Sequence, residues 1–104
     1  MADILIIDDE DYIRDVLSSR VKRMGHDPSA APDLKTGLTR LKAHPFDLVF
    51  LDVNLPDGDG LDALPRIRQA PSTPEVVIIT AVGSARGAEL AIRKIGRASC
   101  RERV

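Results

Sequence analysis

Side chains that could carry chemistry follow three apolar runs of the chain. Asp8 and Asp9 come directly after the first run, Asp52 and Asn54 come at the end of the second, and Thr80 follows the third. If these runs are neighbouring parallel strands, their C-terminal ends lie at one edge of a sheet, which is where ligands bind in open parallel sheets. Three aspartates would then meet in a small region, and clustered carboxylates repel one another unless a cation or a proton lies among them.

A hard divalent cation is the expected partner of these carboxylates. Oxygen-only ligands with no histidine or cysteine nearby favour Mg²⁺ over zinc. Mg²⁺ commonly shares a phosphate oxygen with its substrate, so the pattern indicates phosphoryl transfer, in which a carboxylate can be the covalent nucleophile. Asp52 is the best candidate for that nucleophile, and the hydroxyl of Thr80 could then donate to a phosphoryl oxygen.

The segments that must position these residues alternate between strand and helix patterns. Residues 4–7, 48–51 and 76–79 are short runs rich in aliphatic side chains, which is typical of parallel strands buried on both faces. Residues 26–30 are a weaker strand candidate. Pro28 restricts that strand to an edge of the sheet, because proline has no N–H to donate to a neighbour.

Helical spacing appears between the strand candidates. The first helix ends at Gly25, the second begins at the capping candidate Asp33 and ends before Pro45, and the third contains Pro65, which fits only in a first turn or at a bend. A fourth helical pattern covers residues 84–94. The predicted apolar faces are Ile13, Val16, Leu17, Val21 and Met24 for the first helix, Leu34, Leu38 and Leu41 for the second, and Leu61, Leu64 and Ile67 for the third.

Taken together, these elements predict one α/β domain. The alternation of strand and helix favours an open parallel sheet with right-handed crossovers and helices on both faces. A chain of 104 residues has the usual length of a single domain.

Composition restricts the classes of function. The net charge is −1, so we expect no direct binding of nucleic acid or anionic lipid. No apolar run approaches the roughly 18 residues of a membrane helix, and the N-terminus lacks the basic flank of a secretory signal. Cys100 is the single cysteine and cannot form an internal disulfide, which agrees with a reducing compartment. We therefore expect a cytoplasmic protein with no membrane partner.

Three blocks of the sequence resemble the receiver domains of bacterial response regulators. The resemblance is specific because the blocks occur in the family's order and each lies at a predicted strand end. They are residues 6–10 (Ile-Ile-Asp-Asp-Glu), residues 51–56 (Leu-Asp-Val-Asn-Leu-Pro) leading to residues 60–61 (Gly-Leu), and residues 79–81 (Ile-Thr-Ala). The similarity as a whole runs from about residue 4 to residue 94. Residues 61–67 and 81–84 are also similar to nitrogen-regulation-type regulators.

The resemblance implies a flavodoxin-like, doubly wound parallel sheet with strand order 2-1-3-4. It implies that Asp52 accepts a phosphoryl group from a sensor histidine kinase, and that Asp9, Asp52 and the backbone carbonyl of Asn54 hold Mg²⁺. Asp8 would assist, largely through water, and Thr80 would be the switch residue that alters an output surface. The chain would then be a signalling module of a two-component phosphorelay rather than an enzyme, with an effector domain expected as a partner in the full-length protein.

The sequence departs from the family's pattern after Lys94. Receiver domains continue with a fifth strand that ends in a lysine and with a last helix, and residues 95–104 are too polar and arginine-rich to supply that strand. We expect residues 1–94 to be an incomplete receiver domain, and residues 95–104 to be a non-native tail encoded by read-through into a sequencing-library adapter. The fourth strand would then be an exposed edge through which copies associate. Phosphorylation would also be impaired without the lysine.

Other interpretations fit parts of the pattern. Asp8, Asp9 and Glu10 alone would suit the first turn of a helix, where acidic side chains complement the helix dipole. Residues 57–60 suggest a calcium-binding loop, although its glycine and acceptor positions are violated in either register. Two further functions stay open. The absent lysine would suit a phosphorylation-independent interaction module, and a phosphatase of the haloacid-dehalogenase type would suit the aspartyl nucleophile, although Asn54 stands where that class has a second aspartate.

Overall fold

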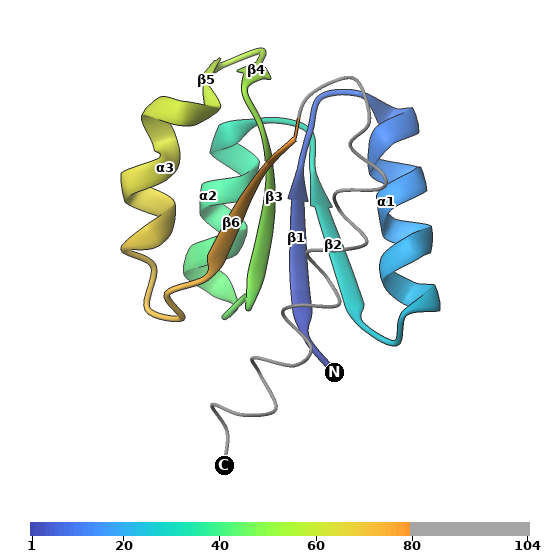
Figure 1. Cartoon of the computed structure of the whole chain (residues 1–104). Helices are drawn as coiled ribbons and strands as arrows, with labels where there is room; N and C mark the ends of the chain where they lie inside the picture. The colour runs from blue at the N-terminus through green and yellow to red at the C-terminus, as the bar shows by residue number, and fades with distance from the viewer. Residues whose placement is uncertain (80–104) are drawn as a thin grey trace.

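A parallel sheet lies between two layers of helices in the computed structural model, which describes residues 1–79 (Figure 1). Over these residues the sheet has four strands in the order β2-β1-β3-β6, and every neighbouring pair is parallel. The predicted order 2-1-3-4 is therefore confirmed, with β6 as the fourth strand of the sheet. The elements are β1 (Asp3–Ile7), α1 (Asp11–Arg23), β2 (Asp27–Ala31), α2 (Leu34–Ala43), β3 (Leu48–Asp52), β4 (Asn54–Leu55), β5 (Gly58–Asp59), α3 (Gly60–Arg68) and β6 (Glu75–Ile79).

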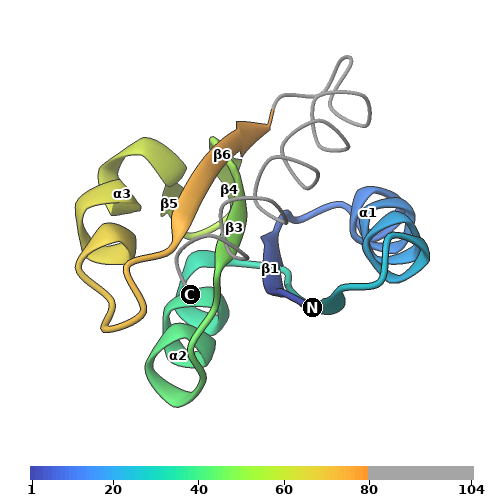
Figure 2. The ribbon, with the colours of Figure 1, turned by 60° about the horizontal axis from the view of Figure 1, so that its bottom comes forward.

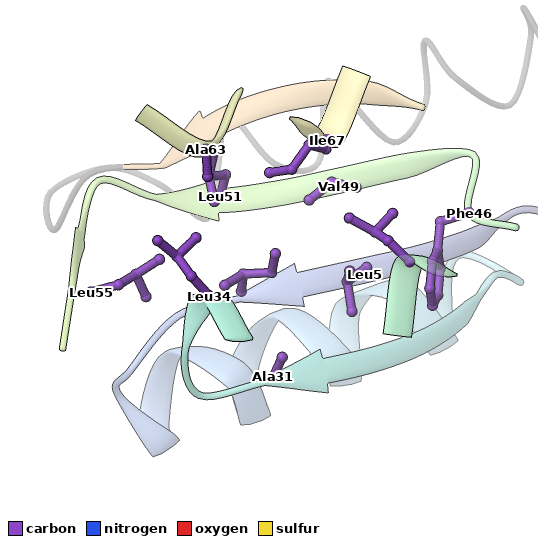
Figure 3. Close-up of a cluster of buried hydrophobic side chains, with 11 residues drawn as sticks. Leu5, Ala31, Leu34, Phe46, Val49, Leu51, Leu55, Ala63 and Ile67 are labelled. Atoms are coloured by element: carbon purple, nitrogen blue, oxygen red, sulfur yellow. The ribbon is translucent and has the colours of Figure 1, made fainter. Parts of the chain in front are cut away.

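The central strands are buried on both faces because successive side chains of a strand point to opposite sides of the sheet. Ile4 and Ile6 of β1 pack on the side covered by α1, while Leu5 and Ile7 pack on the side covered by α2 and α3. Figure 2 shows α1 on one side of the sheet and the other two helices opposite it. Figure 3 shows the second of these clusters, which β3 shares through Val49 and Leu51. Near-continuous aliphatic runs are therefore needed in β1 and β3.

Helix α1 ends where the sequence predicts, and α2 both begins and ends where the sequence predicts. Gly25 has a φ of +86°, a left-handed conformation that a residue without a Cβ adopts at little cost, and it stops α1. The side chain of Asp33 accepts a hydrogen bond of 2.7 Å from the backbone N–H of Thr36 and caps α2. Leu17 and Val21 are the buried residues of α1.

The predicted apolar face of α3 is wrong in one position. Leu61 is 50% exposed, and the buried residues of the helix are Gly60, Ala63 and Ile67. The helix also contains Pro65 in its interior, beyond the first turn. Pro65 leaves the carbonyl of Leu61 without its usual donor, and because both residues lie on the exposed side, water can satisfy that group.

A short antiparallel hairpin, β4–β5, follows β3, and the sequence pattern did not predict it. Asn54 pairs with Asp59 and Leu55 pairs with Gly58. The hairpin takes the chain from the end of β3 to the start of α3, so it borders the edge of the sheet where the aspartates lie.

Strand β2 lies at an edge of the sheet and contains Pro28, as predicted. The structure contains no helix between residues 1 and 79 that is long and apolar enough to cross a bilayer. Several predictions concern residues outside the described part of the chain: the switch residue Thr80, the fourth helix over residues 84–94, and the domain boundary with its tail over residues 95–104.

Candidate functional site

Three aspartates meet beyond the C-terminal ends of β1 and β3. Ile7 pairs with Leu51 in the parallel register, so Asp8 and Asp52 are the next residues on neighbouring strands. One carboxylate oxygen from each of Asp8, Asp9 and Asp52 lies within 4.8 Å of the others. The convergence that the sequence predicted is therefore present in the structure.

These carboxylates border a cleft of about 260 Å³. Asp8 is buried at 5% exposure, Asp52 is half-buried and Asp9 is exposed, so the cluster runs from the sheet interior to solvent. Ile79 faces Asp52 across the β3–β6 pair and closes one side of the cleft. The lining residues are Asp8, Asp9, Glu10, Ile13, Asp52, Val53, Asn54 and Ile79.

Asp8 is held in place through both its backbone and its side chain. Its N–H donates to the carbonyl of Ala31 at 3.1 Å, and its own carbonyl accepts from Arg14 Nη1 at 2.7 Å. Its Oδ1 accepts from the backbone N–H of Glu10 at 2.9 Å. Arg14, which also pairs with Asp11, was not among the predicted residues. Its contribution is to fix the loop between β1 and α1.

The alternative in which the acidic residues only cap α1 is not what the structure shows. Glu10 occupies the N-cap position, but its side chain makes no capping hydrogen bond. The Oδ1 atom of Asp8 binds the N–H of the cap residue itself rather than a first-turn N–H. Asp8 and Asp9 instead lie beside Asp52.

The site disfavours negative charge. Burial raises the pKa of Asp52 most, and the charge of Asp8 raises it further; the N–H of Asn54 lowers it, and the charge of Asp9 adds a smaller increase. Burial also raises the pKa of Asp8, and the charge of Asp9 adds to this, although the N–H of Glu10 opposes it. A divalent cation among these carboxylates would relieve both the mutual repulsion and the cost of burial.

Gly60 lets the start of α3 approach the end of β3. Its N–H donates to the carbonyl of Val53 at 2.8 Å. A Cβ on this residue would overlap the backbone carbonyl oxygen of Asp52, so no larger residue fits without a shift of the backbone. Glycine is thus required here by close approach, a feature that the sequence pattern alone does not distinguish from an ordinary turn glycine.

Asn54 lies at the mouth of the site. Its backbone N–H is 3.4 Å from Asp52 Oδ1, a long hydrogen bond, and the residue lines the cleft. The structure therefore brings together four of the five predicted site residues, whereas Thr80 lies outside the described part of the chain. The ligand atoms that the structure brings together are the carboxylate oxygens of Asp8, Asp9 and Asp52, a set of hard donors that fits Mg²⁺.

Comparison with known proteins gives a consistent result. A family model described as the response regulator receiver domain matches residues 4–97. The chain is 46% identical over 81 residues to the response regulator protein PilR of Pseudomonas aeruginosa, a match that covers 77% of this chain and 18% of PilR. The chain thus spans less than a fifth of that relative's length.

Solved structures of response regulators have the same fold. TrrA of Thermotoga maritima, solved in complex with Mg²⁺-BeF, is 28% identical with a TM-score of 0.72, over 88% of this chain and 81% of that one. TrrA in complex with the histidine kinase ThkA is 29% identical with a TM-score of 0.72, and the match covers 83% of this chain and 74% of that one. NtrX of Brucella abortus, in complex with ADP, is 32% identical with a TM-score of 0.71, and the match covers 91% of this chain and 22% of that one. This likeness is compatible with the nitrogen-regulation-type similarity.

The family model covers nearly the whole chain, and the fold agrees with it. The fold class is the predicted α/β, flavodoxin-like arrangement. The chain therefore belongs to the response regulator receiver domain family.

Proposed function

We propose that the chain is a phosphoacceptor signalling domain that receives a phosphoryl group on Asp52 in the presence of Mg²⁺. The observation that carries this proposal is the meeting of Asp8, Asp9 and Asp52 within 4.8 Å at the ends of two neighbouring strands. Three like charges in one place lower the stability of the fold unless a cation binds there. A purely structural role of these aspartates would therefore not explain the cluster.

Asp52 is better placed than Asp8 to be the acceptor. Asp8 is buried, and its Oδ1 is already engaged by the N–H of Glu10. Asp52 is half-buried and borders the cleft, so a donor can approach it from solvent. Asp9 is exposed and supplies charge at the rim.

The transfer forms a bond between a carboxylate oxygen of Asp52 and phosphorus, while the bond from phosphorus to the donor breaks and the donor leaves with that electron pair. Asp9, Asp52 and the backbone carbonyl of Asn54 would hold Mg²⁺, and Asp8 would orient a bound water. The cation would neutralise charge on the transferring group. The residues of this chain mainly hold the acceptor in line with the donor. Thr80 is proposed as the residue that then senses the phosphoryl group.

The proposed partner is a histidine kinase in the cytoplasm. Support comes from the complex of the similar regulator TrrA with the kinase ThkA. An effector domain is proposed as the second partner, because this chain matches only 18% of the length of PilR. We also propose that the domain is a signal carrier and not an enzyme with multiple turnovers.

Phosphorylation tests this function directly. The chain is incubated with Mg²⁺ and acetyl phosphate, or with a phosphorylated kinase, and intact mass is measured with Asp52→Asn and Asp15→Asn in parallel. Asp15 lies on an exposed part of α1, so its variant carries the same charge change away from the cleft. We expect a single phosphoryl adduct, formed at a reduced rate, on the wild type and on Asp15→Asn, and none on Asp52→Asn.

Two results would contradict the proposal. Steady release of phosphate over many turnovers would indicate a phosphatase. Adduct formation that survives Asp52→Asn would indicate a different acceptor.

A further inference from the structure

Asp57 connects two elements that are far apart in the sequence. Its Oδ1 accepts from the backbone N–H of Leu34 and its Oδ2 accepts from the backbone N–H of Lys35, each at 2.9 Å. The first N–H groups of a helix have no hydrogen-bond partner within the helix, so the two oxygens of a carboxylate can satisfy two of them at once. These two hydrogen bonds lower the pKa of Asp57, which keeps the carboxylate charged.

The start of α2 is thereby satisfied from two sources. The N–H groups of Leu34 and Lys35 bind Asp57, which lies more than 20 residues later in the chain. The next two are bound locally, because the side chain of Asp33 accepts from Thr36 and the carbonyl of Asp33 accepts from Gly37. Asp33 and Asp57 thus both cap the start of α2, but only Asp57 lies in the segment that directly follows β3 and Asp52.

The hairpin β4–β5 joins Asp57 to that site. Asp57 lies in the turn between the two strands, and Asn54 pairs with Asp59 at the open end of the hairpin. Leu55 is buried in the same apolar cluster as Leu34, and Figure 3 shows the two side chains close together. The hairpin is therefore fixed to α2 by one apolar contact region and by the two hydrogen bonds of Asp57.

We propose that Asp57 is a positioning residue for the cation site: by anchoring the hairpin β4–β5 to the first turn of α2, it fixes the backbone of Asn54 at the mouth of the cleft. The inference rests on the proposed function, in which the Asn54 carbonyl is a ligand. Mg²⁺ tolerates little deviation from octahedral geometry, so a small displacement of one ligand weakens binding.

Mg²⁺ affinity, measured by isothermal titration calorimetry on the full chain, tests this role. The variants are Asp57→Ala and its matched control Asp33→Ala, which also removes a cap of α2 but leaves the hairpin contact in place. We expect Asp57→Ala to weaken Mg²⁺ binding about tenfold, as the loss of a group supporting a metal ligand commonly does. We expect Asp33→Ala to lower the melting temperature as Asp57→Ala does, with Mg²⁺ affinity unchanged.

Asp57→Asn gives a graded check and decides the question if Asp57→Ala does not fold. Its single acceptor oxygen can bind one of the two N–H groups, so Mg²⁺ affinity between that of wild type and Asp57→Ala is expected. The proposal is overturned if both Asp57 variants bind Mg²⁺ like the wild type, or if Asp33→Ala loses as much affinity. If the wild type itself binds no Mg²⁺, the proposed function fails as well. If the wild type binds Mg²⁺ and the Asp57 variants bind it equally well, only the positioning role of Asp57 fails.

Discussion

At the scale of single residues, the three aspartates differ in what surrounds each carboxylate. Asp8 is buried and hydrogen-bonded to the adjacent loop, whereas Asp52 is half-buried and faces the cleft. The positions of both could be predicted because each directly follows an apolar strand. The double hydrogen bond of Asp57 to α2 could not be predicted, because it depends on how the hairpin packs and no local pattern encodes a contact over more than 20 residues.

The raised pKa values give a prediction at this scale. A carboxyl group whose pKa is raised on folding binds more protons when folded, so its contribution to the free energy of unfolding falls as pH rises from about 4 through the raised pKa. Without Mg²⁺ at pH 7, Asp52→Asn should therefore raise the melting temperature by a few degrees, since about 1 kcal/mol gives roughly 4–8 °C in a small domain. Thermal unfolding at pH 7 and below pH 4 measures this.

Added Mg²⁺ should raise the melting temperature of Asp52→Asn less than that of the wild type. The increase in the wild type should become smaller as pH falls through the raised pKa of Asp52, because a protonated carboxyl group is a poor ligand. Asp15→Asn serves as the control, with a Mg²⁺ response like that of the wild type. A melting temperature of Asp52→Asn below that of the wild type at pH 7 without Mg²⁺ would show that the cluster does not strain the fold.

At the scale of secondary structure, the long elements follow from the sequence and the short ones do not. Aliphatic runs predicted β1 and β3, since burial on both faces needs them. The third run predicted β6, but the expected burial on both faces is wrong there, because Ile78 is exposed and the two valines are half-buried. The two-residue strands β4 and β5 are too short to give a periodic pattern. Leu61 was expected on the inner face of α3, but Gly60 takes the closest position because only glycine fits against the carbonyl of Asp52.

Gly60→Ala tests this close approach. The added methyl group must push α3 away from the end of β3, so we expect a loss of about 1–3 kcal/mol in the free energy of unfolding. We also expect slower phosphorylation and weaker Mg²⁺ binding. Gly25→Ala is the matched control, because its left-handed φ of +86° costs on the order of 1–3 kcal/mol for a residue with a Cβ, yet nothing lies near it. Equal phosphorylation rates in the two variants at matched stability would argue against a role for Gly60 in the site.

At the scale of the whole molecule, the sheet has helices on both faces and its functional edge at the C-terminal ends of the strands (Figures 1 and 2). The three-layer arrangement was predictable because alternating strands and helices allow few topologies. The proposed boundary at residue 94 and the non-native origin of residues 95–104 stay predictions, which resequencing of the locus from independent clones tests. Identical codons in genomic DNA would refute the adapter origin.

Self-association belongs to this scale as well. Among residues 1–79, β6 pairs with β3 on one side, and Ile78 is 37% exposed. Exposed strand edges are templates for pairing with another chain, so we expect concentration-dependent association in size-exclusion chromatography with light scattering. Ile78→Lys should shift the equilibrium toward monomer, because charge on an edge strand opposes pairing. A sharp monomer at every concentration would contradict this expectation.

The proposed function requires that Asp52, among the three clustered aspartates, carries the phosphoryl group. Borohydride reduces an acyl phosphate to an alcohol, so a phosphorylated aspartate becomes homoserine, which peptide mass spectrometry can locate. After Mg²⁺-dependent phosphorylation, we predict homoserine at position 52 and aspartate at positions 8 and 9. Homoserine at position 8 or 9, or a phosphorylated protein with aspartate intact at position 52, would show that Asp52 is not the acceptor.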